Sequence, residues 1–160
     1  MKLDAFDQST ALVVSQVKRT ANLHGKPAIL VQGRSDTLVP VNHASRAYYG
    51  MNQVTEGAAS QVRYYEVQNA QHFDAFITAF PGYQQRLVPL HRYVINALDL
   101  MYAHLKTGAA LPPSQVVRTT PRGVTTPVPA ITAANVPPIA ATPAAADAIT
   151  FAAGTLTIPE

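Results

Sequence analysis

The distribution of proline limits what the last third of this chain can fold into. Nine of the thirteen prolines lie between Pro112 and Pro159, mixed with alanine and threonine, and only four charged residues follow Gly108. Proline lacks a backbone N–H group and clashes with the preceding helical turn, so this spacing excludes regular helix and predicts extended chain. We therefore divide the sequence into residues 1–108, where regular helices can form, and an extended Pro/Ala/Thr-rich tail over residues 109–160.

Residues 1–108 alternate between helical and extended patterns. Apolar residues at helical spacing predict helices, and short runs of aliphatic, β-branched or aromatic residues predict strands. This alternation is typical of a parallel α/β unit, and because two strands make too small a sheet, further strands should flank them. The expected elements are a helix over residues 9–23, a strand over 27–31, a helix capped by Asn42, a strand over 62–67, and a helix over 85–106 that Gly108 ends.

Two of the expected helices carry an apolar stripe, which predicts the face that packs against the sheet. The stripe consists of Leu12, Val13, Val17 and Ala21 in the first helix, and of Leu87, Leu90, Val94, Leu98, Met101, Tyr102 and Leu105 in the last.

The tail can be interpreted in three ways. Its proline content fits a disordered linker, but its low charge and its aliphatic residues favour a segment that docks on a protein surface. A third interpretation makes the prolines a ligand for a partner's aromatic groove, although no P-x-x-P motif with a basic anchor is clear. Near the end, Ile149, Phe151, Leu156 and Ile158 alternate around Gly154, which predicts a terminal β-hairpin. The aliphatic residues that favour docking are Val116, Val117, Ile131, Val136, Ile139 and Ile149.

Charge and hydropathy exclude several classes of function. The net charge of +3 and the pI near 9.3 come from scattered lysines and arginines, so we expect a solvated surface and no nucleic-acid partner. The longest apolar runs are far shorter than a membrane-spanning helix and no signal-peptide pattern opens the chain, so we expect no membrane segment and leave the compartment open. The absence of cysteine excludes disulfides, thiolate metal sites and a cysteine nucleophile.

Two loops that follow the predicted strands carry an acid and a base. Asp36 follows the strand at residues 27–31, and His72 follows the strand at residues 62–67. The carboxyl ends of parallel strands meet at one edge of a sheet, so we expect these side chains to lie within reach of each other, with Gly33 allowing a sharp turn. An aspartate bound to one imidazole nitrogen orients the ring, and the other nitrogen takes a proton from a hydroxyl nucleophile. The alternative is a loop or cap carboxylate and a histidine that faces solvent.

Other polar residues give weaker signals. Arg34, His43 and Tyr48 could line a pocket for an ester or its terminal carboxylate, although tyrosine at helical spacing is more often a core residue. The remaining histidines lack the spacing of metal ligands, and the string His72-Phe73-Asp74 alone is poor evidence for a metal site. No phosphate-binding glycine loop and no dinucleotide fingerprint occurs, so we expect neither a metal nor a cofactor.

Four stretches of the sequence resemble one enzyme family. The strings GRSDTLVP and NAQHFDAF, the helical segment PGYQQRLVPLHRYVINALDLMYAHL and the ending TLTIPE are similar to D-(−)-3-hydroxybutyrate oligomer hydrolases. The resemblance covers the chain but only the C-terminal portion of that family's longer proteins. It implies the last two strands and flanking helices of an α/β-hydrolase sheet, whose triad runs Ser, Asp, His along the chain. It also implies that Asp36 is the triad acid and His72 the triad base of a serine esterase that hydrolyses 3-hydroxybutyrate oligomers to monomers.

The same resemblance identifies what this chain lacks. No G-x-S-x-G motif occurs, and Ser35, which lies two residues after Gly33, is inside the acid loop and cannot be a nucleophile that precedes it. We therefore expect the nucleophile and the oxyanion hole outside this chain, and secretion in some members of the family. The competing hypothesis is a non-enzymatic truncated fragment without activity of its own, which would expose a sheet edge and self-associate through it.

Overall fold

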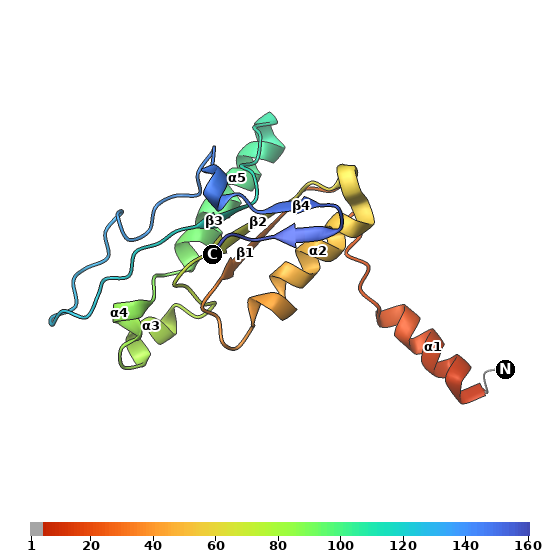
Figure 1. Ribbon diagram of the computed structural model, residues 1–160, viewed down its shortest axis with the longest axis horizontal. Helices are drawn as coiled ribbons and strands as arrows, with labels where there is room; N and C mark the ends of the chain where they lie inside the picture. Colours follow the sequence, from red (N-terminus) through yellow and green to blue (C-terminus); the bar gives the residue numbers. More distant parts are fainter. Residues whose placement is uncertain (1–4) are drawn as a thin grey trace.

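A computed structural model describes residues 5–160, which form an α/β arrangement around a parallel sheet (Figure 1). The sheet has the strand order β1-β2-β3, where β1 spans Ala28–Gly33, β2 spans Val62–Val67 and β3 spans Gln115–Val117. Both neighbouring pairs run parallel. The predicted α/β class is therefore confirmed, and β3 flanks the two predicted strands, although it comes from the tail, where the sequence predicted no parallel strand.

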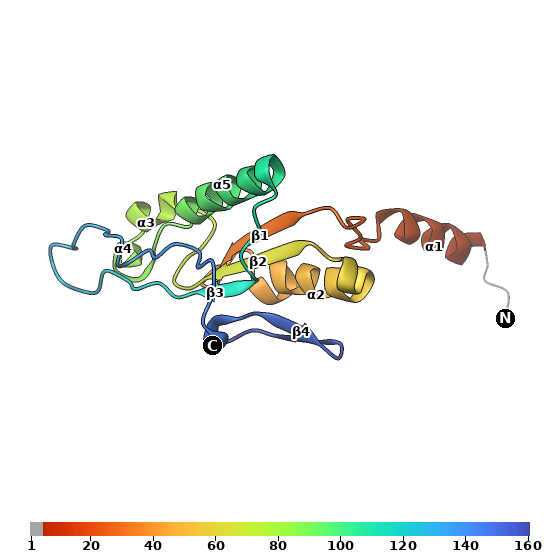
Figure 2. The ribbon, with the colours of Figure 1, turned by 90° about the horizontal axis from the view of Figure 1, so that it is seen from above.

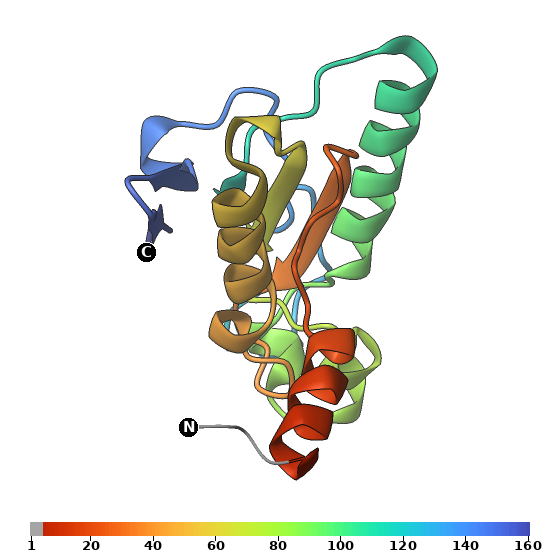
Figure 3. The same ribbon diagram turned by 90° about the vertical axis from the view of Figure 1, so that its right-hand side faces the viewer.

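Helices cover the two faces of this sheet (Figures 2 and 3). Helix α2, Ser45–Glu56, lies on one face and helix α5, His91–Thr107, lies on the other. An antiparallel hairpin of β4, Thr150–Ala152, and β5, Thr155–Thr157, lies on the same side as α2, which confirms the predicted terminal hairpin. Helix α2 also provides the crossover that two adjacent parallel strands require.

The side chains of β2 contribute to two cores, because successive residues of a strand point to opposite faces. Val62 and Tyr64 are fully buried on the side of α2, and Tyr65 and Val67 are fully buried on the side of α5. Strand β2 has the bounds predicted from its β-branched and aromatic residues, and β1 extends slightly beyond the predicted residues 27–31. The centre of the sheet therefore follows from local sequence.

The tail packs against both faces of the sheet. Val117, Val136 and Ile139 belong to the core on the side of α5, while Val116 and Ile149 belong to the core on the side of α2. Docking is thus confirmed over these residues, and the disordered-linker interpretation is wrong for them. Both cores contain residues from either side of residue 108, where the proline content of the chain changes.

Strand β3 lies within the part of the chain that is rich in proline, but it contains no proline itself. Pro112 and Pro113 precede it and Pro121 follows it, so Gln115–Val117 keeps the N–H groups that a parallel ladder uses. A strand of this length shows too little alternation to be predicted from its own residues.

The helix predicted over residues 85–106 is two separate helices. Helix α4 spans Tyr83–Arg86 and α5 spans His91–Thr107, and a short helix α3, Ala75–Ala79, precedes them. Pro89 explains the interruption, because its ring disfavours the helical conformation of the residue before it. The predicted start of the long helix is therefore wrong.

Local contacts and backbone conformation explain where α5 begins and where it ends. The Asp74 carboxylate accepts hydrogen bonds from the backbone N–H groups of Leu90 at 2.7 Å and His91 at 3.0 Å, which satisfies donors that the first helical turn leaves free. At the other end, Gly108 adopts the left-handed conformation with φ of 75°. The predicted end at Gly108 is confirmed.

The face of α5 that packs against the sheet differs from the predicted one. Tyr93 and Ala97 are buried, whereas Leu98 and Tyr102 of the predicted stripe are 65% and 69% exposed. Leu90 is the stripe residue that is buried at the start of the helix. Large apolar residues lie on both faces of α5, so helical spacing alone could not select the buried one.

Helix α1, Ala5–Val17, projects away from the rest of the described chain (Figure 1). It ends earlier than the predicted range 9–23, and its predicted apolar stripe is exposed at Leu12, Val13 and Val17. Ala21 is buried but lies beyond the helix, where its carbonyl oxygen accepts a hydrogen bond from Asn52 of α2 at 2.8 Å. Between residues 5 and 160, none of the helices has the combined length and hydropathy needed to cross a bilayer.

The predicted cap of α2 is also wrong. Asn42 lies in a 3-10 turn, Val41–His43, and the residue at the start of α2 is Ala44, which makes no side-chain capping bond. The Asn42 side-chain oxygen instead accepts a hydrogen bond from Nη1 of Arg46 at 3.0 Å. A nearby cation therefore binds the polar group that was expected to cap the helix.

Candidate active site

Asp36 and His72 lie against each other at the carboxyl end of the sheet. Strand β1 ends at Gly33 and strand β2 at Val67, and each strand leads into the loop that carries one of the two residues. Nδ1 of His72 lies 2.5 Å from Oδ2 of Asp36, and the same oxygen accepts the backbone N–H of His72 at 3.2 Å. The structure thus brings together the acid and the base that the sequence indicated.

The Asp36 carboxylate is buried and held by backbone groups. Its side chain is 1% exposed, and Oδ1 accepts N–H groups from Leu38 at 3.0 Å and Val39 at 2.9 Å. Burial alone would raise the pKa of Asp36, but the hydrogen bonds from Val39, His72 and Leu38 together hold that pKa below its ordinary value of 3.8. The group is therefore ionised at neutral pH and fixed in orientation.

The imidazole of His72 is partly open to solvent. Its side chain is 32% exposed, and its ring lies beside that of Phe73 with a centroid separation of 4.1 Å. Nδ1 faces Asp36, and within residues 5–160 no hydrogen bond engages Nε2. An imidazole held by a carboxylate at one nitrogen and free at the other has the geometry of a general base.

Gly33 allows the acid loop and the histidine loop to touch. A Cβ atom at this position would lie 2.1 Å from the carbonyl oxygen of Ala70. The backbone N–H groups of Arg34 and Ser35 donate to the carbonyl oxygens of Val67 at 2.7 Å and Ala70 at 3.0 Å. Glycine is thus required for close approach of the two backbones, whereas the sequence predicted a role in turning the chain.

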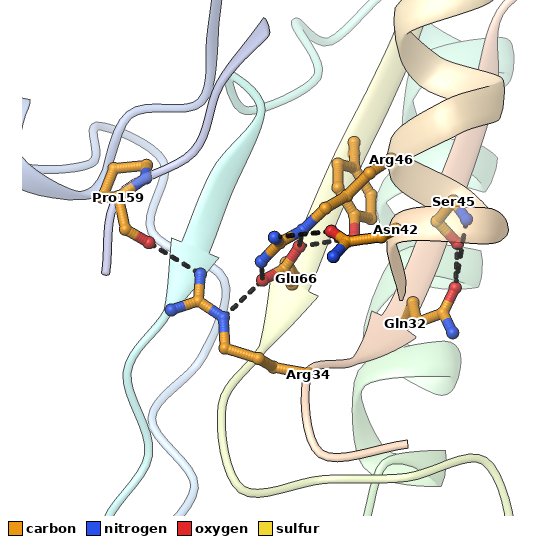
Figure 4. A network of polar contacts seen from close by, with 8 residues as sticks. Gln32, Arg34, Asn42, Ser45, Arg46, Glu66 and Pro159 are labelled. Atoms are coloured by element: carbon orange, nitrogen blue, oxygen red, sulfur yellow. Dashed lines mark hydrogen bonds and ion pairs between the residues drawn. The ribbon is translucent and has the colours of Figure 1, made fainter. Parts of the chain in front are cut away.

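The Gln32 side chain holds the loop that carries Asp36 in place. Its Nε2 donates to the carbonyl oxygen of Val39 at 2.5 Å, and its Oε1 accepts the backbone N–H of Ser45 at 3.3 Å and the Ser45 hydroxyl (Figure 4). The loop that carries Asp36 is thereby joined to the start of α2. The sequence analysis missed this residue, although a glutamine at the end of an apolar strand is a usable signal.

Two cavities open beside the pair. The smaller one, of about 240 Å³, is lined in part by Asp36 and His72 themselves. The larger one, of about 450 Å³, is lined by Ser35, Thr37 and Gln71 and by side chains from α3 and α4. Because these three residues are the chain neighbours of Asp36 and His72, a molecule in the larger cavity lies next to the candidate acid and base.

The three residues predicted to bind substrate lie elsewhere. Arg34 turns toward Glu66, and His43 and Tyr48 line a separate hollow of about 100 Å³ beside α2. None of the three lines either of the cavities described above. Substrate binding by these residues stays a prediction.

A second charged cluster surrounds Glu66 of β2 (Figure 4). The fully buried Glu66 carboxylate accepts hydrogen bonds from Arg46 at 2.6 and 2.8 Å, from the Tyr64 hydroxyl at 2.6 Å and from Nε of Arg34. Nη2 of Arg34 also donates to the carbonyl oxygen of Pro159 at 2.8 Å. The cluster joins β2, α2 and the end of the tail.

The charges of this cluster stabilise one another. Burial alone would raise the pKa of Glu66, but hydrogen bonds from Arg46, Tyr64 and Arg34 lower it below its ordinary value of 4.5. The hydrogen bond to Glu66 in turn raises the pKa of Arg46, and burial strongly raises the pKa of the Tyr64 hydroxyl. The cluster therefore contains a permanent carboxylate between two permanent cations.

Neither carboxylate is set up to bind a metal ion. In the part of the chain that the structure describes, no group of three or more His, Asp or Glu side chains gathers closely enough to hold one. The oxygens of Asp36 and Glu66 already accept the hydrogen bonds given above. Both carboxylates are thus engaged by hydrogen-bond donors of the protein.

Comparison with known families gives this arrangement a context. Residues 3–160 match the profile of the family described as 3HB-oligomer hydrolase (3HBOH). The chain belongs to this family. It is 65% identical over 148 residues to a protein of Polaromonas naphthalenivorans, a match that covers 92% of this chain and 21% of that protein. It is 56% identical over 160 residues to a protein of Cupriavidus pinatubonensis, which covers 98% of this chain and 23% of that protein.

Both of these 3HB-oligomer hydrolase relatives are named D-(−)-3-hydroxybutyrate oligomer hydrolase. The chain spans about a fifth of the length of the curated relatives that it matches. The resemblance noted in the sequence, to a part of longer proteins of this family, is thus confirmed. No solved structure matches the chain significantly.

Proposed function

We propose that this chain is a segment of an esterase that hydrolyses 3-hydroxybutyrate oligomers to monomers, and that it supplies two of the three catalytic side chains. The contact of 2.5 Å between Nδ1 of His72 and Oδ2 of Asp36, with Nε2 left open, carries the proposal. The names of the relatives supply the substrate class. Along the chain, the acid follows one strand and the histidine follows the next, with a helix between them. This order supports an α/β-hydrolase fold for the whole enzyme.

In the proposed mechanism, a serine hydroxyl from outside this chain attacks the ester carbonyl carbon, and Nε2 of His72 accepts the hydroxyl proton. Asp36 holds the ring through Nδ1 and stabilises the imidazolium. The imidazolium then donates its proton to the departing alkoxide, which leaves as the hydroxyl group of a hydroxybutyrate unit, and the acyl group stays on the serine. Water, activated by the neutral His72, releases the acyl group and restores the serine.

The oxyanion that forms on the carbonyl oxygen needs hydrogen-bond donors of its own. We assign these donors to backbone N–H groups outside this chain, because no G-x-S-x-G motif is present in it. The same observation favours a second hypothesis for the chain taken alone, which is that it has no catalytic activity. The isolated 160-residue chain is then expected to hydrolyse a short nitrophenyl ester no faster than buffer does.

A hybrid protein tests the proposal. In this hybrid enzyme, the matching segment of the full-length Polaromonas naphthalenivorans relative is replaced by the present chain, which shares 65% identity with it. We expect His72→Ala to reduce kcat for a 3-hydroxybutyrate trimer by about ten-thousand-fold or more, since the general base is lost.

His91→Ala is the matched control, because His91 is exposed at the start of α5 and its side chain makes no hydrogen bond within residues 5–160. We expect kcat of this variant to equal that of the unmodified hybrid enzyme. Full activity of His72→Ala would refute the proposal, and turnover by the isolated chain that depends on His72 would refute the second hypothesis.

A further inference from the structure

The larger cavity beside the candidate active site has an unusual wall. Phe76 belongs to α3, Phe80 follows it, and Tyr83 begins α4. Their rings follow one another at centroid separations of 4.9 and 5.3 Å. Phe80 and Tyr83 are 46% and 37% exposed, so large aromatic surface faces the solvent at this site. Concave surfaces lined by aromatic groups with a few polar groups beside them are typical of ligand sites.

This aromatic wall is continuous with the candidate catalytic histidine. The ring of His72 lies 4.1 Å from that of Phe73, and Phe73 lies 5.0 Å from Phe76, measured between centroids. On the opposite side, Ser35, Thr37 and Gln71 provide a few polar groups. A neutral chain with methyl branches and ester oxygens, as in an oligomer of 3-hydroxybutyrate, matches such a lining.

Arg86 is the charged residue of this cavity. Among the nine described residues that line it, the other eight are neutral. Arg86 is exposed, and none of the ion pairs within residues 5–160 involves it. Its guanidinium group can therefore bind an anion from solution with two parallel N–H donors.

Residues of the tail hold the helix that carries Arg86. Nε of Arg122 donates to the carbonyl oxygen of Gln84 at 2.7 Å, and the N–H group of Gly123 donates to the carbonyl oxygen of Gln85 at 3.2 Å. Arg86 directly follows these two residues in α4. A four-residue helix has little stability of its own, so these bonds give the side chain a fixed base.

We propose that this cavity binds the hydroxybutyrate chain of the substrate and that Arg86 binds its terminal carboxylate. The inference rests on the proposed function for the identity of the substrate. An oligomer of 3-hydroxybutyrate has one free carboxylate, at the end whose unit leaves as the alcohol when the last ester bond is cleaved. Arg86 thus selects oligomers with a free acid end, and it takes the role that the sequence analysis gave to Arg34.

The hybrid enzyme with two matched substrates tests this inference. One substrate is the 3-hydroxybutyrate dimer as the free acid, and the other is the same dimer with its carboxylate converted to the neutral amide. We expect Arg86→Gln to raise KM for the acid by about 10- to 100-fold, the range for loss of a hydrogen bond to a charged group, and to leave KM for the amide unchanged. Arg86→Lys should restore part of the preference, because lysine keeps the charge but not the paired donors.

Arg92→Gln is the control, since Arg92 is exposed on α5 and lies outside the cavity. Equal losses on both substrates with Arg86→Gln, or no loss on either, would overturn the inference. Titration of a dimer acid in which an amide bond replaces the ester bond measures binding to the hybrid enzyme without ester hydrolysis. Weaker binding after Arg86→Gln supports the inference, and unchanged binding refutes it, whether or not His72 proves to be the catalytic base.

Discussion

The same two strands build two charged clusters that differ in the partners of the carboxylate and in the exposure of those partners to solvent. Asp36 and His72 lie in the loops after β1 and β2, and the His72 side chain is 32% exposed. Glu66 lies within β2, is fully buried, and contacts two arginines and a tyrosine. Position along the strand thus separates a pair whose histidine is partly open to solvent from a carboxylate that is fully buried.

The partners of each carboxylate explain the difference. Histidine changes its charge near neutral pH, so a carboxylate beside it can stabilise a proton that comes and goes. Arginine does not release its proton, so the charges around Glu66 are permanent, and their contacts join β2, α2 and the end of the tail. A buried acid with a lowered pKa, such as Glu66, is therefore not by itself evidence of catalysis, because the partner of the acid must also be able to take up and release a proton.

Asp36→Asn should produce the largest effect, and it should act mainly on activity. The amide would keep the shape of the side chain but could not hold the imidazole in the required tautomer, so we expect kcat of the hybrid enzyme to fall by about ten-thousand-fold. Steady-state kinetics on the 3-hydroxybutyrate trimer measures this loss, and a thermal melt should show a smaller loss of stability than Glu66→Gln causes. If the Asp36→Asn variant kept its activity, a residue other than Asp36 would be the acid of the triad.

Glu66→Gln should reduce the stability of the protein rather than its activity. Removal of the carboxylate leaves Arg34 and Arg46 without their buried partner, so we expect the free energy of unfolding to fall by about 3–5 kcal/mol. Urea denaturation of the hybrid enzyme measures the change, and molecules that remain folded should keep their kcat.

Asp147→Asn is the matched control for Glu66→Gln. Asp147 pairs with Arg118 in the tail, where both side chains are partly exposed, so we expect a loss below about 1 kcal/mol. If Glu66→Gln reduced kcat as strongly as Asp36→Asn does, the separation of the two clusters into a catalytic and a structural one would be wrong.

Acid should reduce the free energy of unfolding by a smaller amount, and both clusters should contribute to this loss. Folding lowers the pKa of Asp36 and of Glu66 below their ordinary values of 3.8 and 4.5. The unfolded chain therefore binds protons first as the pH falls, and the stabilisation is complete above these values and is lost as the pH falls through them to the lower pKa values of the folded state.

Urea denaturation at a series of pH values measures this loss of stability, which forms the acid limb of a plot of stability against pH. Glu66→Gln should make the limb shallower, and Asp36→Asn should do the same to a lesser degree because Asp36 has no permanent cation as a partner. A limb that is identical in the unmodified protein and in both variants would show that neither carboxylate couples folding to protonation.

Local sequence predicted the parts of the fold that local physics determines. Strand β2 was predictable because β-branched and aromatic residues fill it, and the contact of Asp36 with His72 followed from the rule that parallel strands end at one edge. Strand β3 was not predictable, because its partner lies about 50 residues earlier and only tertiary contact creates it. The buried face of α5 and the contact of Arg34 with Glu66 also depend on tertiary packing, so local sequence did not predict them.

The larger cavity beside the candidate active site was also not predictable from local sequence. Phe76, Phe80 and Tyr83 precede the helix that the sequence predicted over residues 85–106, and the short helices α3 and α4, which place these rings beside the cavity, were not predicted. Arg86 fell inside that predicted helix, where it had no reason to be singled out. Its place beside the acid and base loops depends on the tail residues that bind α4.

The packing of the tail on both faces of the sheet has a consequence for how the chain is made. A ribosome releases β1 and β2 well before β3, Val136 and Ile149, yet those later residues complete the two cores. Contacts that join such distant positions, including the bond from Arg34 to Pro159, cannot form until the later residue has left the ribosome. We therefore expect residues 28–67 to stay incompletely folded during that interval, in which a chaperone can bind the exposed strands.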